Sequence, residues 1–226
     1  MGKLDDIRRP VAEEMKVFQK RFKSSVHSDV ALLNIITSYT LRQKGKQIRP
    51  LFVFLTSKML GGITESTYTA ASLIELLHTA TLIHDDVVDE SYERRGLFSI
   101  NALWKSKTSV LLGDYFLSRG LLLAVENNDH ELLNIVSHSM KEMVEGELLQ
   151  LQKTRSLNIT IEDYYEVIRK KTATLIASCT SGAAKSVGAK KEVIDQMYDL
   201  GINIGISFHW SESILSSTIT SPIKGM

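Results

Sequence analysis

Three aspartates and two arginines lie close together in residues 75–96, ELLHTATLIHDDVVDESYERRG. Asp85 and Asp89 are four residues apart, so in a helix their side chains share one face, roughly 5–6 Å apart between Cβ atoms. Mg²⁺ takes oxygen ligands and is typically held by one or two carboxylates together with substrate phosphates. Arg94 and Arg95 follow, and a guanidinium group binds phosphate oxygens bidentately. The pattern predicts a helix end that binds a diphosphate ester through Mg²⁺.

The same charges have a simpler interpretation, because acids and arginines near a helix end usually form a solvated, salt-bridged face. His78 lies two helical turns before Asp85 and so is expected on the same face. A single histidine there is more often a buried core residue than a ligand. The residues alone leave both interpretations open.

A second basic segment, KGKQIRP, covers residues 44–50. Gly45 breaks the preceding helix and Pro50 suits the first turn of the next one. Lys46 and Arg49 are therefore expected in a loop that leads into a helix N-terminus, where backbone N–H groups and the helix dipole favour an anion. A basic loop by itself is usually just solvated.

Apolar periodicity predicts long helices along most of the chain and an all-α bundle of mostly antiparallel helices around a central cavity. Thr64 is the expected N-cap of the helix that carries the aspartates, and Thr160 with Asp163 resembles a capping box. We expect a single domain over residues 1–226. The expected helices cover residues 4–22, 29–43, 51–60, 64–89, 108–126, 131–153 and 160–188, with residues 97–107 as a linker.

Composition limits the classes of protein to which the chain could belong. The net charge of +1 gives no reason to expect binding to nucleic acid or to an anionic membrane. The N-terminus lacks the apolar segment of a secretory signal, and we expect no transmembrane segment. Cys179 is the single cysteine, cannot form an internal disulfide, and is expected to be buried in a cytoplasmic protein.

HTATLIHDDVVD followed by RRG resembles the first aspartate-rich motif of the trans-type polyprenyl diphosphate synthases, and in particular the octaprenyl and other long-chain members. The resemblance extends to KGKQIRP, to GELLQ at residues 146–150, and to Lys171-Thr172. It implies an enzyme that condenses isopentenyl diphosphate with an allylic diphosphate, and the family precedent is a homodimer.

The resemblance also implies roles for individual residues. Asp85 and Asp89 would hold Mg²⁺, two or three ions in the family, and would be catalytic together with Lys171. The allylic diphosphate would contact Arg94, Lys171 and Thr172. Isopentenyl diphosphate would contact Lys46, Arg49, His78 and Arg95. Gln47 departs from the family, which usually has a basic residue there and two glycines in this loop.

Two other parts of the sequence bear on the length of the product and on activity. Ala80 and Thr81 precede the aspartates, where a bulky residue in the family blocks long products, so we expect a product longer than farnesyl. After Phe208 the family has Gln and a second aspartate-rich motif, whereas this chain has His209 and then Glu212 among serines. We therefore expect a shortened C-terminus without the last helices and one weakened metal site.

Three functions follow from these expectations. The first is a Mg²⁺-dependent synthase of medium or long polyprenyl diphosphates. The second is a catalytically impaired, truncated homologue that acts as a helical partner subunit of a full-length synthase. The third is a terpene cyclase, which needs no isopentenyl diphosphate site, and Lys46, Arg49 and Arg95 argue against it.

Overall fold

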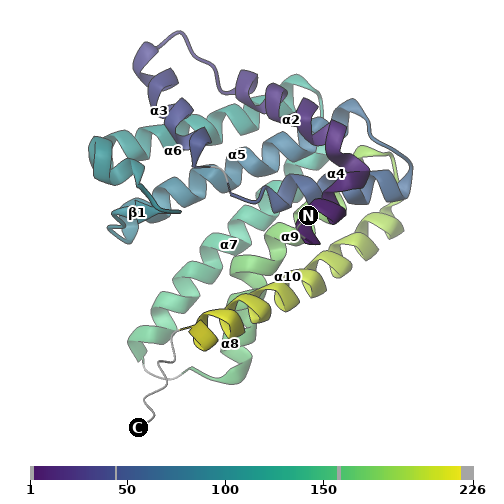
Figure 1. The fold of residues 1–226 in the computed structure, drawn as a ribbon. Helices are drawn as coiled ribbons and strands as arrows, with labels where there is room; N and C mark the ends of the chain where they lie inside the picture. Colours follow the sequence, from purple (N-terminus) through teal and green to yellow (C-terminus); the bar gives the residue numbers. More distant parts are fainter. Residues whose placement is uncertain (1–2, 44, 157–158, 220–226) are drawn as a thin grey trace.

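The structure is a computed structural model that describes residues 3–43, 45–156 and 159–219, with backbone only for Lys3 and residues 211–219. It is an all-α bundle, as expected, with one two-stranded hairpin in the described residues (Figure 1). The elements are α1 Lys3–Arg8, η1 Arg9–Val11, α2 Ala12–Ser25, α3 Ala31–Arg42, α4 Ile48–Leu60, α5 Glu65–Val88, β1 Glu93–Arg94, β2 Leu97–Phe98, α6 Ile100–Glu126, α7 His130–Ser156, α8 Ile161–Ile168, η2 Arg169–Ala173, α9 Thr174–Ser186 and α10 Lys191–Ile219.

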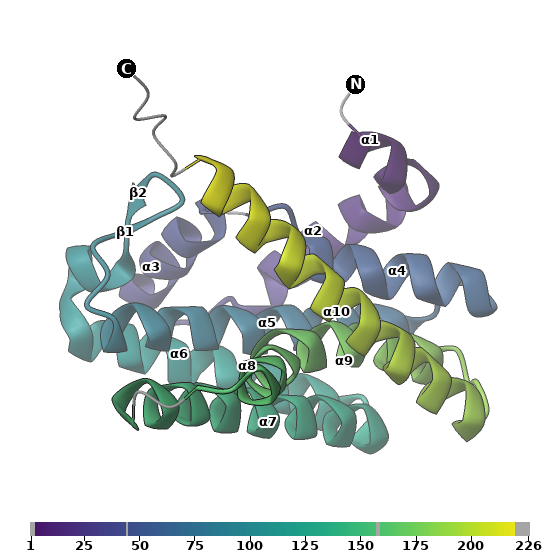
Figure 2. The ribbon, with the colours of Figure 1, turned by 90° about the horizontal axis from the view of Figure 1, so that it is seen from below.

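Helix α5 lies in the middle of the bundle and packs against α4, α6, α7 and α9 (Figures 1 and 2). Its start is fixed as predicted, because Thr64 and Thr67 exchange side-chain and backbone hydrogen bonds in a capping box. Such a cap stabilises a helix by about 1 kcal/mol. The helix buries apolar residues through most of its length and then brings its aspartates to the edge of the bundle.

The core is formed by buried side chains from η1, α2, α3, α4, α5, α6, α7 and α9. Phe18 and Phe54 meet edge to face with ring centroids 5.8 Å apart, and Leu73, Phe116 and Leu132 are also fully buried. Burying each such side chain stabilises the fold by about 1.5–3 kcal/mol. This core anchors the helices from which the polar residues project.

Two expected elements, the first helix and the linker, differ from the structure. Pro10 lacks an N–H, so the helix expected over residues 4–22 is divided into α1, a 3₁₀ turn and α2. The linker expected over residues 97–107 is wrong, because α6 already begins at Ile100, where Ser99 caps it. The helix has non-helical backbone angles at Lys105, and Trp104 packs edge to face on Tyr39.

The helix expected from Thr160 onward is continuous but contains a π-helical turn. The predicted capping box is confirmed, with Thr160 and Asp163 exchanging hydrogen bonds of 3.1 Å. Helix α8 then passes through η2 into α9. Cys179 in α9 is fully buried, as expected, and burial raises the pKa of its thiol to about 12.

Candidate active site

The end of α5 brings Asp85 close to Asp89, Glu147 and Lys171. Asp85 is half-buried, and Asp89 is the exposed C-cap residue, whose backbone N–H donates to the carbonyl oxygen of Asp85 at 2.8 Å. Burial raises the pKa of Asp85, and the Glu147 carboxylate raises it further, while the Lys171 ammonium opposes both. Asp89 adds a smaller effect in the same direction as Glu147. The predicted pair of carboxylates therefore lies beside a lysine.

Asp86 faces a different neighbour, the guanidinium group of Arg94. Arg94 Nε and one terminal nitrogen donate three hydrogen bonds of 2.7–2.9 Å to the two Asp86 oxygens. The Asp86 side chain is only 4% exposed. Such a bidentate, charge-assisted pair fixes both groups. Arg94 was expected to contact an allylic diphosphate. In the structure its guanidinium group is hydrogen-bonded to the Asp86 carboxylate instead.

The two arginines are placed by the hairpin that follows α5. In β1 and β2, Glu93 pairs with Phe98 and Arg94 with Leu97. Arg95 and Gly96 form the loop with φ of 55° and 75°, and positive φ at both positions is typical of two-residue hairpin turns. Arg94 therefore points to Asp86, while Arg95 points away from it and donates a hydrogen bond of 2.7 Å to the Gln43 carbonyl oxygen.

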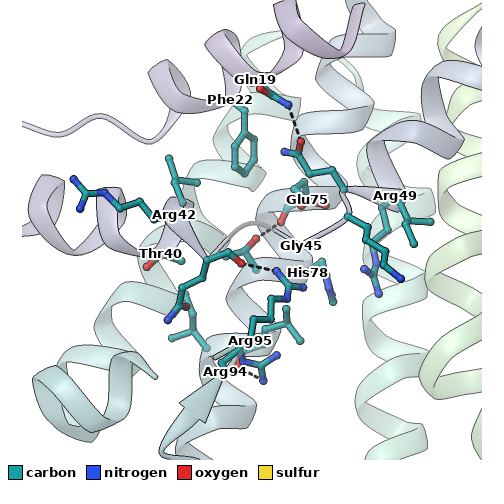
Figure 3. Close-up of a pocket in the computed structure, with 18 of the residues that line it drawn as sticks. Gln19, Phe22, Thr40, Arg42, Gly45, Arg49, Glu75, His78, Arg94 and Arg95 are labelled. Carbon is teal, nitrogen blue, oxygen red and sulfur yellow. Dashed lines mark hydrogen bonds between the residues drawn. The ribbon is translucent and has the colours of Figure 1, made fainter. Parts of the chain in front are cut away.

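A cavity of about 990 Å³ opens beside these arginines (Figure 3). Basic side chains from the loop before α4, from the first turn of α4 and from the hairpin line it together with residues of α5: Lys46, Arg49, Arg94, Arg95, Glu75, His78 and Asp86. Gly45 gives the guanidinium of Arg95 its room, because a Cβ at this position would lie 2.5–2.7 Å from the guanidinium atoms. The structure thus brings together all four residues that were expected to contact isopentenyl diphosphate.

Burial and neighbouring cations set the protonation of the two α5 residues in this cavity. Burial lowers the pKa of His78 well below 6.5, and Arg49, Arg95 and Arg94 lower it further. His78 is therefore neutral, and its Nδ1 atom is buried without a hydrogen-bond partner in the described structure. Burial raises the pKa of Glu75, while Arg49 and Arg95 oppose that shift. His78 shares this cavity with Asp86, whereas Asp85 faces Lys171.

A second cavity of about 380 Å³ lies next to Lys171 and Thr172, between the end of α7, α8 and α10. Lys171 belongs to the π-helical turn η2, and its ammonium is 2.6 Å from Glu147 Oε1 and 3.2 Å from Gln150 Oε1. His209 of α10 also lines this cavity and contacts the ring of Tyr164. The side chains of Ser211, Glu212 and Ser213 lie outside the described residues.

Sequence reasoning gave no role to three residues that the structure brings into the site. Glu75 lies near Arg49 and Arg95 in the structure. Its position three residues before His78 places both side chains on one face of the helix, and this spacing could have indicated its place in the site. Glu147 was noted in the GELLQ segment without a partner, because its contact with Lys171 depends on how two helices pack. Asp86 is the remaining aspartate of the motif, and its position in the sequence indicated no partner.

The carboxylates at the end of α5 fit a Mg²⁺ ion that a diphosphate shares. In the described part of the chain no group of three or more His, Cys, Asp and Glu side chains is close enough to hold a metal. Asp85 and Asp89 supply two carboxylates, which is the number typical of Mg²⁺ sites completed by substrate phosphates and water. Asp85 and Asp89 are the residues that would hold the ion.

The sequence and the fold both match known proteins. The family model described as polyprenyl synthetase matches residues 30–218. The chain belongs to the polyprenyl synthetase family. Octaprenyl diphosphate synthase of Escherichia coli is 34% identical over 212 residues, which are 94% of this chain and 66% of that protein.

Solved structures agree with the family assignment. Decaprenyl diphosphate synthase of Rhodobacter capsulatus superimposes with a TM-score of 0.89 at 32% identity, covering 94% of this chain and 66% of that one. Polyprenyl synthase of Caulobacter crescentus, solved with calcium and isoprenyl diphosphate, gives a TM-score of 0.88 at 32% identity, covering 94% and 65%. The chain thus spans about two thirds of the length of these members of the family.

Helix α6 is the one described helix that is long and apolar enough to cross a membrane, with a mean hydropathy of 1.3 in its most apolar window. The core helix of a soluble protein can pass the same test. Leu112, Phe116 and Ala124 of α6 are buried in the core against α5. Composition alone is therefore weak evidence for a span.

Proposed function

We propose that this chain condenses isopentenyl diphosphate with an allylic diphosphate to make a medium- or long-chain polyprenyl diphosphate. The observation that carries the proposal is a pair of separate cavities, one lined by Lys46, Arg49 and Arg95 and the other by Lys171 and Thr172, with the Lys171 ammonium close enough to Asp85 to lower the pKa of its carboxyl. The arginine-rich cavity and the Lys171 cavity give separate places for two diphosphates. The condensation needs both substrates bound at once, with their reacting carbons next to each other.

In this proposal the arginine-rich cavity binds isopentenyl diphosphate. Arg49 and Arg95 face its diphosphate, Lys46 lies in the loop at the entrance, and neutral His78 donates a hydrogen bond. The site is supported by the three positive charges and by the buried, unsatisfied Nδ1 atom of His78. A neutral histidine can donate only one hydrogen bond, so the tautomer is set by the phosphate oxygen that it meets.

The allylic diphosphate binds on the other side, where Lys171 and Thr172 face Asp85 and Asp89. Lys171 offsets the charge of the leaving diphosphate, and the Thr172 hydroxyl donates a hydrogen bond to it. Mg²⁺ held by Asp85 and Asp89 would supply further charge neutralisation as the C–O bond breaks. Arg94 acts on this site mainly by fixing Asp86, because its guanidinium group already donates hydrogen bonds to the Asp86 carboxylate.

Small residues support a long product. Ala80 is fully buried and Thr81 is half-buried one turn before Asp85, and the Thr81 hydroxyl donates to the His78 carbonyl oxygen. Neither side chain is large enough to block a growing chain. The names of the octaprenyl and decaprenyl relatives agree with this proposal.

We also propose a homodimer in the cytoplasm. The outer face of α6 exposes a run of apolar side chains that no described element covers: Val110, Leu111, Leu121, Leu122 and Val125. Runs of this kind mark contacts with another protein surface. A second copy of the chain, seated through the same helix, would cover the face.

The proposal is tested by incubating the purified chain with Mg²⁺, farnesyl diphosphate and labelled isopentenyl diphosphate. Product longer than farnesyl, lost with a chelator and in Asp85→Ala, supports it. No product, together with binding to a full-length synthase, would favour the partner-subunit alternative. An unchanged rate in Asp85→Ala would refute the assignment of the metal ligands.

A further inference from the structure

Lys171 already has a counter-ion in the structure. Its ammonium lies 2.6 Å from Glu147 Oε1 and donates a hydrogen bond of 3.2 Å to Gln150 Oε1. Glu147 and Gln150 are three residues apart, so both side chains project from one face of α7. A ligand that binds to Lys171 through negatively charged oxygens has to compete with Glu147.

The close approach of α7 to η2 brings Glu147 and Lys171 together. A Cβ at Gly146 would lie 2.8 Å from the Lys170 Cβ and 3.0 Å from the Lys171 backbone nitrogen. Glycine therefore allows α7 to contact η2 at the residue before Glu147. The π-helical turn contains both lysines, and π-helical turns inside α-helices occur frequently at functional sites.

The two lysines of this turn have separate partners. Lys170 contacts Glu145 at 3.2 Å and Glu166 at 3.7 Å. Glu147 is the one that also acts on Asp85, since its carboxylate raises the pKa of Asp85. Glu147 thus contacts Lys171 and is also near enough to Asp85 to act on its carboxyl, whereas Glu145 contacts Lys170.

We infer that Glu147 is a positioning residue that holds Lys171 until the allylic diphosphate binds and then gives it up. The inference rests on the proposed function for its substrate, and it goes further by assigning a residue that sets the affinity for that substrate. Glu147 keeps Lys171 extended over the cavity, and its negative charge weakens binding of the diphosphate until Lys171 exchanges partners.

The test is calorimetric titration of inorganic diphosphate, without metal and with a chelator present, into the wild type, Glu147→Gln and Glu145→Gln. Glu147→Gln removes the competing charge but keeps the shape of the side chain. Both partners of the ion pair are more than one third exposed, so solvent screens the pair. We expect diphosphate to bind about two- to fivefold more tightly to Glu147→Gln. Glu145→Gln, the matched control, should bind as the wild type does.

A double-mutant comparison shows whether the effect acts through Lys171. In a Lys171→Ala background the gain from Glu147→Gln should disappear. Weaker binding to Glu147→Gln, an equal gain in Glu145→Gln, or a gain that persists without Lys171 would each overturn the inference. A residue with only a structural role would not improve binding when it is replaced.

The titration needs no prenyl transfer, so its outcome is separate from that of the product assay. If product forms but Glu147→Gln gains no affinity, this inference fails and the proposed function stands. If Glu147→Gln gains affinity but no product forms, the exchange of partners is supported and the proposed condensation fails. Where product forms, Glu147→Gln should lower KM for the allylic diphosphate and leave KM for isopentenyl diphosphate unchanged.

Discussion

Asp85 and Asp86 are adjacent in sequence but have opposite surroundings. Successive residues of a helix project about 100° apart, so Asp86 meets Arg94 while Asp85 faces Glu147 and Lys171. The Asp86 carboxylate fixes the hairpin through Arg94, whereas the Asp85 carboxylate lies near Lys171. The difference between a structural acid and the proposed metal ligand is thus made by one residue step along α5.

Replacing Arg94 tests the structural role of its pair with Asp86. Arg94→Ala leaves a buried carboxylate without its partner, and we expect the free energy of unfolding to fall by about 3 kcal/mol. Urea denaturation measures this. Arg95→Ala is the matched control on the same hairpin, because it loses only a hydrogen bond to a carbonyl, about 1 kcal/mol. Equal losses in the two variants would contradict the account.

The lowered pKa of His78 predicts how stability depends on pH. Below about pH 6.5 the unfolded chain binds a proton at this histidine and the folded chain does not, so stability falls as the pH falls. His78→Gln should remove up to about 1.4 kcal/mol per pH unit from this slope between pH 6.5 and 5.5. Urea denaturation at several pH values measures it, with the exposed His130→Gln as control.

The raised pKa of Glu75 acts in the opposite direction, because the folded state then keeps a proton that the unfolded state has released. Its contribution is present below the unfolded value of Glu75 and is lost as the pH rises through the folded value. Glu75 is intact in both the wild type and His78→Gln, so the difference between them isolates His78. Parallel slopes would show that His78 is not held neutral.

At the scale of elements, the packing of α7 against η2 decides where the side chain of Lys171 points. Gly146→Ala would place a methyl group against the Lys170 Cβ and the Lys171 backbone. We expect η2 to shift, and misplacement of a site by about 1 Å can cost ~10²-fold in rate. The measurement is kcat/KM for the allylic diphosphate. Gly120→Ala is the control, since its methyl group would meet only leucine side chains, the nearest at 3.2 Å.

Gly146→Ala could instead stabilise the protein without loss of activity, and this result would contradict the account. Alanine favours an α-helix over glycine by about 0.8–1.0 kcal/mol. If Gly146→Ala raised stability by that amount and kept full activity, the close approach of α7 to η2 would have no functional importance.

Much of the helical architecture could be predicted from local signals. Thr64 and Thr160 with Asp163 marked the starts of α5 and α8, because a cap depends on only a few neighbouring residues. The division of the first helix at Pro10 was also a local signal that was overlooked. The hairpin and the early start of α6 were missed, because apolar periodicity does not report positive φ at Arg95 or a kink at Lys105.

The candidate site was predictable in its composition but not in its pairing. Types and spacing indicated Asp85 with Asp89 and the basic loop, and the resemblance added Lys171. Which cation meets which anion depends on contacts between distant segments, such as Arg94 with Asp86 and Lys171 with Glu147. A single sequence contains no direct signal for such contacts.

At the scale of the whole molecule, the apolar face of α6 predicts how copies of the chain associate. Leu111 and Leu122 are 59% and 45% exposed and lie three helical turns apart on one face. Replacing both by aspartate should convert the dimer to a monomer in sedimentation velocity. Leu148→Asp on α7, where the side chain is 60% exposed, should leave association unchanged. A monomeric wild type would contradict the proposed homodimer.

The most direct test of the two-cavity account is a pair of calorimetric titrations, one with isopentenyl diphosphate and one with a non-ionisable thio analogue of farnesyl diphosphate. We expect the first to bind without Mg²⁺ and to be weakened in Arg49→Ala and Arg95→Ala. The second should bind much more tightly with Mg²⁺ than without it and be weakened in Asp85→Ala and Lys171→Ala, with both ligands bound at once. Competition between the two ligands for one site, or binding of the analogue unaffected by Mg²⁺ and Asp85, would contradict it.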